Sequence, residues 1–516
     1  MRVGRPTVEI DPTLPDYPTI IHALADKTTA IPDLEAIACG PRALTYAQYG
    51  RAVAGYAHML DARRVAGERV ALLMENGIEV AVASLAAMAA RAQAAPMNPM
   101  FPAKALVPLI RDVDPAVLIC DTASAALATE VASAAGISRL DVFGPDGLSV
   151  DQWTQDTTLA LPKLMPAPSD PSLIFFTGGT TGIPKGADHN HANDMAFARA
   201  SNTLWNIGQN GARILDVAPS FHVWGFFHIV VNPVFMGAAV DVVPAYKPEE
   251  VLKRFQEKKI TVFAGGPASI YVGLRAHPDF KTTDFSELKF CFSGGSPCST
   301  DLLNGWESDT GCPILEGWGM TEGAPINVNP IEGLRKPGTV GINVPLTEID
   351  IVDLDTGETI LPPGERGEVR VRGPQFVASY RNQPEENAAT FRDGWLYTGD
   401  IGVYDEEGYL TLVDRKKELI LVGGYNVYPR EVDEVLTAHP AVMEAAAIGM
   451  PDEFRGETVK ACVALNPGAE LNEEDLIAHC QDHLVKYKVP TAVEFFDELP
   501  KTGPTKIDKL KLKGLR

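Results

Sequence analysis

The residue types best suited to chemistry lie in residues 177–186, which read Thr-Gly-Gly-Thr-Thr-Gly-Ile-Pro-Lys-Gly and directly follow an apolar run. Glycines such as Gly178 and Gly179 let backbone N–H groups converge on an anion. The hydroxyls of Thr177, Thr180 and Thr181 add hydrogen-bond donors. We therefore predict a phosphate-binding loop, with an ordinary glycine-rich turn from a strand to a helix as the plain structural alternative.

Lys185 would add positive charge to this loop, but its neighbours exclude a Walker loop. That motif needs Gly-Lys followed by Ser or Thr, whereas here Pro184 precedes the lysine and Gly186 follows it. The predicted phosphate site must therefore be of another kind.

The loop closely resembles the signature loop of the adenylate-forming superfamily, which includes acyl-CoA synthetases, luciferases and nonribosomal adenylation domains. That family usually has Ser where this chain has Gly179. Further matches follow in the family's order over most of the chain: residues 191–193, 219–225, 293–297, 316–322, 397–400, 414–431 and 499–506. A single match could be chance, but an ordered series of this kind is not.

The resemblance implies a role for each nucleotide-binding residue. The loop would hold the β- and γ-phosphates of ATP, Glu322 would bind Mg²⁺ through its carboxylate oxygens, and Thr321 would donate to the α-phosphate. Asp400 would accept hydrogen bonds from both ribose hydroxyls, and Arg415 would add a charged donor to the same sugar.

The adenine site is expected at two further matching segments. Gly294, Gly295 and Ser296 would pass their backbone close to the base. In the segment that begins with Glu316 and Gly317, Trp318 would stack on adenine, although a buried tryptophan is more often plain core.

Lys506 matches the family's catalytic lysine, which bridges the substrate carboxylate and the α-phosphate, and here Thr505 precedes it where the family usually has Gly. The plain alternative is a solvated basic tail.

Lys417 falls at the family's hinge, and Gly423 and Gly424 would line the tunnel for the CoA thiol once the small domain has rotated. A simple β-turn is the structural alternative for these two glycines.

The acyl pocket is expected at the motif that begins with Pro219. His222 would separate the acyl pocket from the nucleotide and thiol channels, and Trp224, Phe226, Phe227 and Gly319 would line the pocket. The segment 223–231 is mainly apolar and carries no Arg or Lys that could pair with a second carboxylate, so an apolar acid is expected.

The elements that must position these residues follow an α/β pattern, in which apolar runs alternate with loops and helix-like segments. The uniformly apolar runs predict strands covered on both faces, at 70–73, 173–176, 214–217, 260–263 and 290–292, and the Ala-rich residues 79–92 predict a helix that packs on such a sheet. Residues 338–413 alternate like a small β-barrel or a twisted sheet. After them we expect a helix from Pro429, strands near 443–449 and 458–465, and a helix capped by Asn472.

The predicted organisation is therefore a large N-terminal domain over residues 1–413, a hinge at 414–417 and a mobile α+β C-terminal domain over 418–516. The resemblance implies that the large domain contains two α/β subdomains besides the β-barrel.

The composition indicates which kinds of binding partner and which location the protein can have. Lys and Arg number 45 against 67 Asp and Glu, a net charge of −22 that repels nucleic acids, although local donors still permit ATP. The longest apolar stretch, residues 80–90, is far shorter than the ~20 residues of a membrane span. Seven scattered cysteines without a CxxC pair indicate reduced thiols, and we expect a cytoplasmic protein that could also pair as a homodimer.

The function expected from the resemblance is that of an ATP-dependent, AMP-forming acyl-CoA synthetase, with ATP and CoA as cosubstrates and Mg²⁺ as cofactor. A medium- or long-chain fatty acid is the expected substrate, with a medium-chain optimum favoured. A carrier-protein-directed acyl-AMP ligase and an aryl-CoA ligase stay open, and so does a luciferase-like oxygenase, which nothing in the sequence supports. A non-catalytic nucleotide-binding protein is the alternative of another class.

Overall fold

The computed structural model describes residues 8–177, 184–208, 211–502 and 506–514. Contacts between residues divide the chain into two compact units. The large unit contains Pro6–Glu348 and Val371–Leu396, and the small unit contains Ile349–Arg370 and Tyr397–Arg516. The hinge at 414–417 lies within the small unit and stays a prediction.

A six-stranded sheet forms the first half of the large unit. Its strand order is β6 (Leu140–Phe143), β5 (Val117–Asp121), β3 (Arg69–Leu73), β4 (Gln93–Met97), β7 (Pro171–Thr177) and β8 (Lys185–Asn190). Neighbouring strands pair in parallel except β7 and β8, which are antiparallel. Parallel strands covered on both faces explain the continuous apolar runs.

A nine-stranded sheet forms the second half. Its order is β15 (Ile342–Asn343), β14 (Gly323–Val328), β13 (Ile314–Met320), β12 (Phe290–Ser293), β11 (Val262–Gly266), β9 (Arg213–Asp216), β10 (Ala239–Val242), β1 (Glu35–Cys39) and β2 (Arg42–Thr45). The strands from β13 to β1 in this order pair in parallel. Their carboxyl ends therefore meet at one edge, where ligands commonly bind in such sheets.

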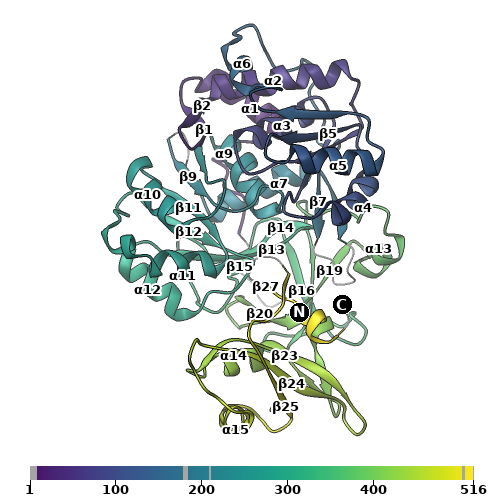
Figure 1. Ribbon diagram of the computed structural model, residues 1–516, viewed down its shortest axis with the longest axis vertical. Helices are drawn as coiled ribbons and strands as arrows, with labels where there is room; N and C mark the ends of the chain where they lie inside the picture. Colours follow the sequence, from purple (N-terminus) through teal and green to yellow (C-terminus); the bar gives the residue numbers. More distant parts are fainter. Residues whose placement is uncertain (1–7, 178–183, 209–210, 503–505, 515–516) are drawn as a thin grey trace. The chain divides into compact units, whose positions relative to one another are not determined.

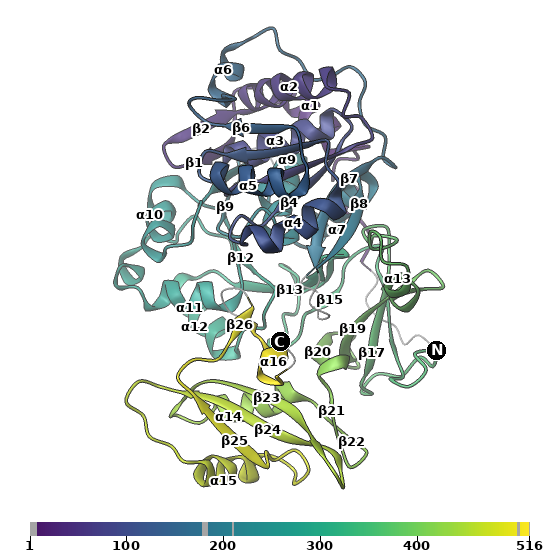
Figure 2. The ribbon, with the colours of Figure 1, turned by 45° about the vertical axis from the view of Figure 1, so that its right-hand side comes forward.

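Side chains of successive strand residues face different helix layers. Val70 and Leu72 join a core shared by both sheets, whereas Ala71 and Leu73 pack against a separate helix layer. The shared core contains α1 (Ile20–Ala30), α2 (Tyr46–Ala62), α3 (Ile78–Ala89) and α7 (His191–Leu204). The separate layer of α4 (Ala103–Val113) and α5 (Ala125–Ala135) is visible in Figure 2, and α6 (Val150–Gln155) packs on α2.

The nine-stranded sheet is covered in the same way. One face carries α10 (Pro248–Lys258), α11 (Ala268–Ala276), the 3₁₀ helix η2 (Pro278–Thr282) and α12 (Thr300–Thr310), which lie together on the left of Figure 1. The other face meets the shared core through the π-helix η1 (Phe227–Val231) and α9 (Asn232–Met236), which follow α8 (Val223–Phe226).

The Ala-rich segment forms α3 as expected, but the helix ends before the predicted residue 92. Arg91 has a left-handed backbone, with φ of 59°, and the chain then enters β4. The reversal is tight because the small residues around it are completely buried between helix and sheet.

A five-stranded sheet occupies the region predicted as a small β-barrel or a twisted sheet. Its order is β16 (Glu348–Val352), β17 (Gly367–Arg372), β19 (Trp395–Tyr404) and β18 (Phe391–Arg392), and β20 (Leu410–Arg415) pairs with β19. The helix α13 (Pro384–Thr390) and the 3₁₀ turn η3 (Lys416–Glu418) lie along the same part of the chain. The division between the two units passes through the strands of this sheet.

The C-terminal part of the small unit has its own mixed sheet. The order is β22 (Tyr425–Val427), β21 (Ile420–Val422), β24 (Gly456–Leu465) and β23 (Val442–Asp452), with β25 (Ala492–Phe496) parallel to β24. Helices α14 (Pro429–Thr437) and α15 (Glu473–His483) share one core with it. The short pair β26 (Lys501–Thr502) and β27 (Lys506–Ile507) precedes α16 (Lys509–Leu512). The predicted α/β fold with a smaller α+β part is thus confirmed.

Candidate active site

The predicted phosphate loop joins two antiparallel strands and not a strand to a helix. Thr177 ends β7, Lys185 begins β8, and these two residues are paired across the strands. The predicted residues Gly178, Gly179, Thr180 and Thr181 lie outside the described residues. The loop therefore starts and ends at one point, and Lys185 is fixed there by the strand pairing.

Lys185 belongs to a cluster of polar side chains. Its ammonium forms an ion pair with Glu386 of α13 and lies 5.3 Å from the ring centre of Tyr380. The Tyr380 hydroxyl donates a hydrogen bond to a carboxylate oxygen of Glu322. The structure thus brings together Lys185 and Glu322, which are far apart in sequence.

Glu322 lies in the turn from β13 to β14 and is only 5% exposed. The neighbouring Thr321 is held through its backbone, because His189 Nε2 donates to the Thr321 carbonyl at 2.8 Å. Burial lowers the pKa of His189 to about 4, so the ring is neutral at pH 7 and holds the proton on Nε2. The turn is therefore anchored to β8.

Glu322 is a suitable metal ligand, because its carboxylate offers the oxygen atoms that Mg²⁺ prefers. Among the described residues, no three His, Cys, Asp or Glu side chains gather closely enough to hold a metal ion by themselves. Mg²⁺ usually uses one or two protein carboxylates together with substrate phosphates and water. One buried carboxylate near Lys185 fits that pattern.

The predicted adenine-binding glycines follow β12, at the carboxyl edge of the nine-stranded sheet. Gly295 has φ of +80°, which favours glycine, and a Cβ on Gly294 would approach Trp224 Cζ3 to 2.7 Å. Ser296 Oγ accepts a hydrogen bond from the Ala268 backbone N–H at 3.2 Å. Gly294 is thus required by close packing, and Gly295 by backbone conformation.

The segment with Trp318 continues this edge along β13. Glu316 is buried, and one of its carboxylate oxygens accepts a hydrogen bond from the Cys298 N–H at 2.9 Å. A Cβ on Gly317 would clash with Trp205 at 2.3 Å, and Trp318 itself is only 8% exposed. Glu316 and Gly317 therefore have clear structural roles, and the stacking of Trp318 on adenine stays a prediction.

The residues predicted for the acyl pocket differ in their surroundings. Phe226 and Phe227 are fully buried and pack against Phe175, and Phe227 also contacts Phe197. Trp224 is partly exposed. Its ring lies near Gly294, and a Cβ on Gly266 would stand 3.7 Å from its indole nitrogen.

His222 and Gly319 are both exposed. His222 is the N-cap of α8, where its Nδ1 accepts a hydrogen bond from the Trp224 N–H at 3.3 Å. Desolvation by the surrounding protein lowers the pKa of His222 from its usual value. A Cβ on Gly319 would approach Ala324 Cβ to 2.7 Å, so close packing alone requires glycine there.

In the small unit, the two predicted ribose ligands form an ion pair. Asp400 on β19 and Arg415 at the end of β20 are paired residues of adjacent strands, and Arg415 Nε lies 2.6 Å from Asp400 Oδ1. Asp400 is 4% exposed, whereas the Arg415 side chain is 44% exposed. The carboxylate is therefore held rigidly, and the guanidinium remains accessible from solvent.

Gly423 and Gly424 form the two-residue turn between β21 and β22. Both have positive φ, 59° and 84°, and Val422 pairs with Tyr425 across the turn. Two-residue hairpin turns of this type require such a backbone, which explains the glycines structurally. Their role in a CoA tunnel stays a prediction, as does that of Lys417, which lies exposed in η3.

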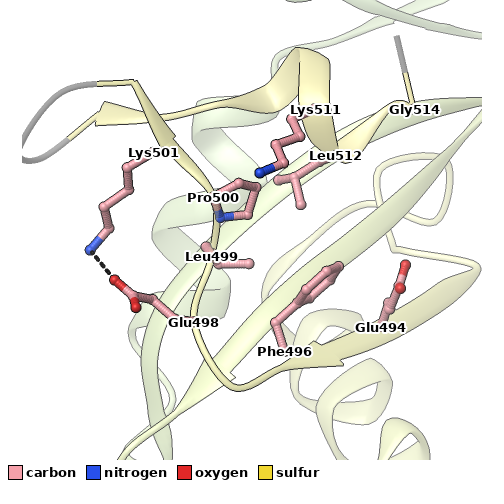
Figure 3. Close-up of a pocket in the computed structure, with 9 residues that line it drawn as sticks. All are labelled: Glu494, Phe496, Glu498, Leu499, Pro500, Lys501, Lys511, Leu512 and Gly514. Carbon is pink, nitrogen blue, oxygen red and sulfur yellow. Dashed lines mark ion pairs between the residues drawn. The ribbon is translucent and has the colours of Figure 1, made fainter. Parts of the chain in front are cut away.

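Lys506 begins β27, and its backbone pairs with Thr502 of β26. Beside this strand pair lies a pocket of about 590 Å³ (Figure 3), lined by Glu494, Phe496, Glu498, Leu499, Pro500, Lys501, Lys511, Leu512 and Gly514. The pocket contains none of the predicted nucleotide or acyl residues. The role of Lys506 itself stays a prediction.

Sequence reasoning missed Tyr380 and Glu386, which contact the two most important predicted side chains of the large unit. Neither lies in one of the segments matched to the family in the sequence analysis. The only local signal is Pro384, which marks the first turn of a helix with acidic residues.

Comparisons with known proteins show which family this chain belongs to. The AMP-binding enzyme family matches residues 24–381, and its C-terminal domain matches residues 431–506. The chain therefore belongs to the AMP-binding enzyme family.

Individual relatives carry several names. A long-chain-fatty-acid–CoA ligase of Bacillus subtilis (strain 168) is 41% identical over 356 residues, which cover 69% of this chain and 63% of the relative. The chain thus matches less than two thirds of that relative's length. An oxalate–CoA ligase of Arabidopsis thaliana is 33% identical over 507 residues, 96% of this chain and 98% of the relative.

Among solved structures, ATP-bound MatB from Rhodopseudomonas palustris superposes with a TM-score of 0.88 at 30% identity, covering 97% of this chain and 99% of that one.

Within the described ranges, no helix is long and apolar enough to cross a membrane.

Proposed function

We propose that this protein is an ATP-dependent, AMP-forming acyl-CoA synthetase. It joins a carboxylate to the α-phosphate of ATP with release of pyrophosphate, and then transfers the acyl group from AMP to the thiol of CoA. The observation that carries the proposal is the cluster of Lys185 and buried Glu322 at the edge of the phosphate loop, in a chain of the AMP-binding enzyme family.

The first half-reaction brings two anions together, so positive charge and hydrogen-bond donors must surround the phosphates. Lys185 neutralises phosphate charge at the loop, and Thr321 donates its hydroxyl to the α-phosphate. Mg²⁺ held by Glu322 would neutralise further phosphate charge. Asp400 binds the ribose hydroxyls, and Lys506 bridges the carboxylate and the α-phosphate.

The second half-reaction needs a path for the CoA thiol to the acyl carbonyl. Rotation of the C-terminal domain about Lys417 withdraws Lys506 and brings Gly423 and Gly424 to the thiol path. The absence of side chains at these two positions suits a narrow channel, and a built Cβ at either one meets no atom within 4 Å in the present arrangement.

The proposed substrate is a medium- or long-chain fatty acid. The apolar residues 223–231, the partly exposed Trp224 and the name of the Bacillus relative support this choice. The name of the Arabidopsis relative points instead to a very small diacid, and aryl acids also suit an aromatic wall. These acids therefore belong in the test.

The deciding experiment is pyrophosphate release from ATP over an acid panel from acetate to palmitate, with benzoate, oxalate and adipate added. Each acid is assayed without acceptor, with CoA and with a phosphopantetheinylated carrier protein. Acid-dependent pyrophosphate release and formation of an acyl-CoA are expected, and Glu322→Gln serves as the inactive control. Acyl transfer to the carrier protein but not to CoA would show that the carrier protein, and not CoA, is the acceptor. Absence of acid-dependent pyrophosphate release would refute the proposal.

A further inference from the structure

Residues 377–381 connect the two halves of the cluster around Lys185 and Glu322. The Val377 N–H donates to the Glu322 carbonyl at 2.8 Å, and the Arg381 N–H donates to the Gly186 carbonyl at 2.8 Å. Tyr380 also forms an isolated antiparallel bridge with Ala187 of β8. This segment therefore holds the turn that carries Glu322 and the strand that carries Lys185 in one rigid frame.

The position of Tyr380 is itself fixed from both sides. Its N–H donates to Asn387 Oδ1 at 2.7 Å, and Asn387 Nδ2 donates back to the Tyr380 carbonyl at 2.8 Å. The ring packs edge-on against Phe391, with 5.3 Å between the ring centres. The phenol therefore has little freedom to leave Glu322.

The hydrogen bond to Glu322 has a defined direction. The Tyr380 hydroxyl contacts a Glu322 carboxylate oxygen. A phenol carries its proton at neutral pH, whereas an ionised carboxylate can only accept. The phenol therefore stays protonated and donates, and the Glu322 carboxylate accepts. A hydrogen bond of this kind orients the carboxylate, as outer partners commonly do for metal ligands.

Glu386 forms an ion pair with the ammonium of Lys185. The Lys185 side chain is 11% exposed, whereas that of Glu386 is 36% exposed. A carboxylate satisfies a buried ammonium in the same way as a phosphate oxygen. ATP phosphates that reach Lys185 would therefore compete with Glu386, whose partly exposed side chain can turn towards solvent.

We propose that Tyr380 is a positioning residue that orients Glu322 for the metal–nucleotide complex, and that Glu386 holds Lys185 as a substitute for phosphate until ATP displaces it. This inference rests on the proposed function. It assigns opposite effects to two neighbouring side chains: Tyr380 strengthens binding of the metal–nucleotide complex, and Glu386 competes with it.

The test measures binding and not turnover. Mn²⁺ replaces Mg²⁺ as a paramagnetic probe, free Mn²⁺ is measured by electron paramagnetic resonance in the presence of ATP, and ATP affinity is measured by calorimetry. Tyr380→Phe should weaken Mn²⁺ binding about 10- to 100-fold, the usual effect of losing a hydrogen bond to a metal ligand. Glu386→Gln should tighten ATP binding about 2- to 5-fold, as expected for removing a partly exposed charged partner.

Tyr46→Phe is the matched control, because Tyr46 is a buried tyrosine of the same unit whose hydroxyl donates to backbone carbonyls in the core. It should leave both affinities unchanged; equal weakening by Tyr46→Phe and Tyr380→Phe would overturn the positioning role. If wild type binds Mn²⁺ and ATP but Tyr380→Phe binds Mn²⁺ equally well, the inference alone fails. If wild type binds neither, the proposed function fails with it. Should Tyr380→Phe not fold, unchanged or weaker ATP binding by Glu386→Gln overturns the inference.

Discussion

Replacing Trp224 by Ala should shift the preferred acid towards longer chains. The indole lies at the carboxyl ends of β11 and β12, where Gly266 and Gly294 leave space for it. His228 and Phe292 pack around the indole, with ring centres 4.8 Å and 6.4 Å from that of Trp224. Truncation therefore opens an apolar space at the end of the expected acyl pocket.

The magnitude follows from burial of the added chain. Each methylene that enters apolar surroundings contributes about 0.8 kcal/mol, so two additional carbons contribute about 1.6 kcal/mol. In kcat/KM this equals roughly a 15-fold gain for the longer acid relative to the acid preferred by wild type. Short acids should lose little, because they do not reach the space.

The assay is pyrophosphate release in the presence of CoA, with kcat/KM measured for even-numbered acids from acetate to palmitate. Trp153→Ala is the control, because Trp153 is also a partly buried tryptophan but packs against Tyr56 in a distant part of the core. An unchanged ratio between long and short acids in Trp224→Ala would refute the assignment of Trp224 to the pocket wall. An equal shift in Trp153→Ala would refute it as well.

Three further predictions concern the two half-reactions and acid stability. Lys506→Ala should lower adenylation by about 10²- to 10³-fold but leave thioester formation from supplied acyl-adenylate intact, and equal loss in both assays would contradict its role. Lys417→Pro should let acyl-AMP accumulate while acyl-CoA formation falls, whereas unchanged turnover would move the hinge elsewhere. Burial lowers the pKa of His228 to about 3, so the folded state loses stability as pH falls below about 6.5, where the unfolded chain binds the proton. His228→Phe should therefore reduce the loss of melting temperature between pH 7 and pH 5, where the linkage amounts to about 2 kcal/mol, and an unchanged loss would contradict this.

Local sequence signals predicted the regular elements well where one physical cause dominates. Asn472 caps α15 as expected, because its side chain accepts from the Asp475 N–H at 2.8 Å. The sequence allowed two interpretations of Gly423 and Gly424, a lining of the CoA tunnel and a simple β-turn. The structure shows the β-turn. The strand β4 was missed, because its residues Gln-Ala-Ala-Pro-Met lack the β-branched side chains typical of strands.

The orientation of the aromatic residues after His222 could not be predicted from the sequence. Almost every residue from Val223 to Val231 is apolar, so no polar face distinguishes pocket from core. The chain also changes from α8 to the π-helix η1 at Phe227, which alters the spacing of the faces. Only the packing shows that Phe226 and Phe227 lie in the core and that Trp224 lies at the sheet edge.

The parallel sheet explains why motifs distant in sequence could still be assigned to one region. Gly266 is paired with Ser293, and Ser293 with Glu316, so the segments that follow β11, β12 and β13 leave the sheet at the same edge. No such rule brings Tyr380 there. It lies 58 residues after Glu322 and reaches that residue only because the chain returns from β17 to pair with β8. Residues placed by the sheet are therefore predictable from strand ends, whereas residues that support them from returning loops require the folded structure.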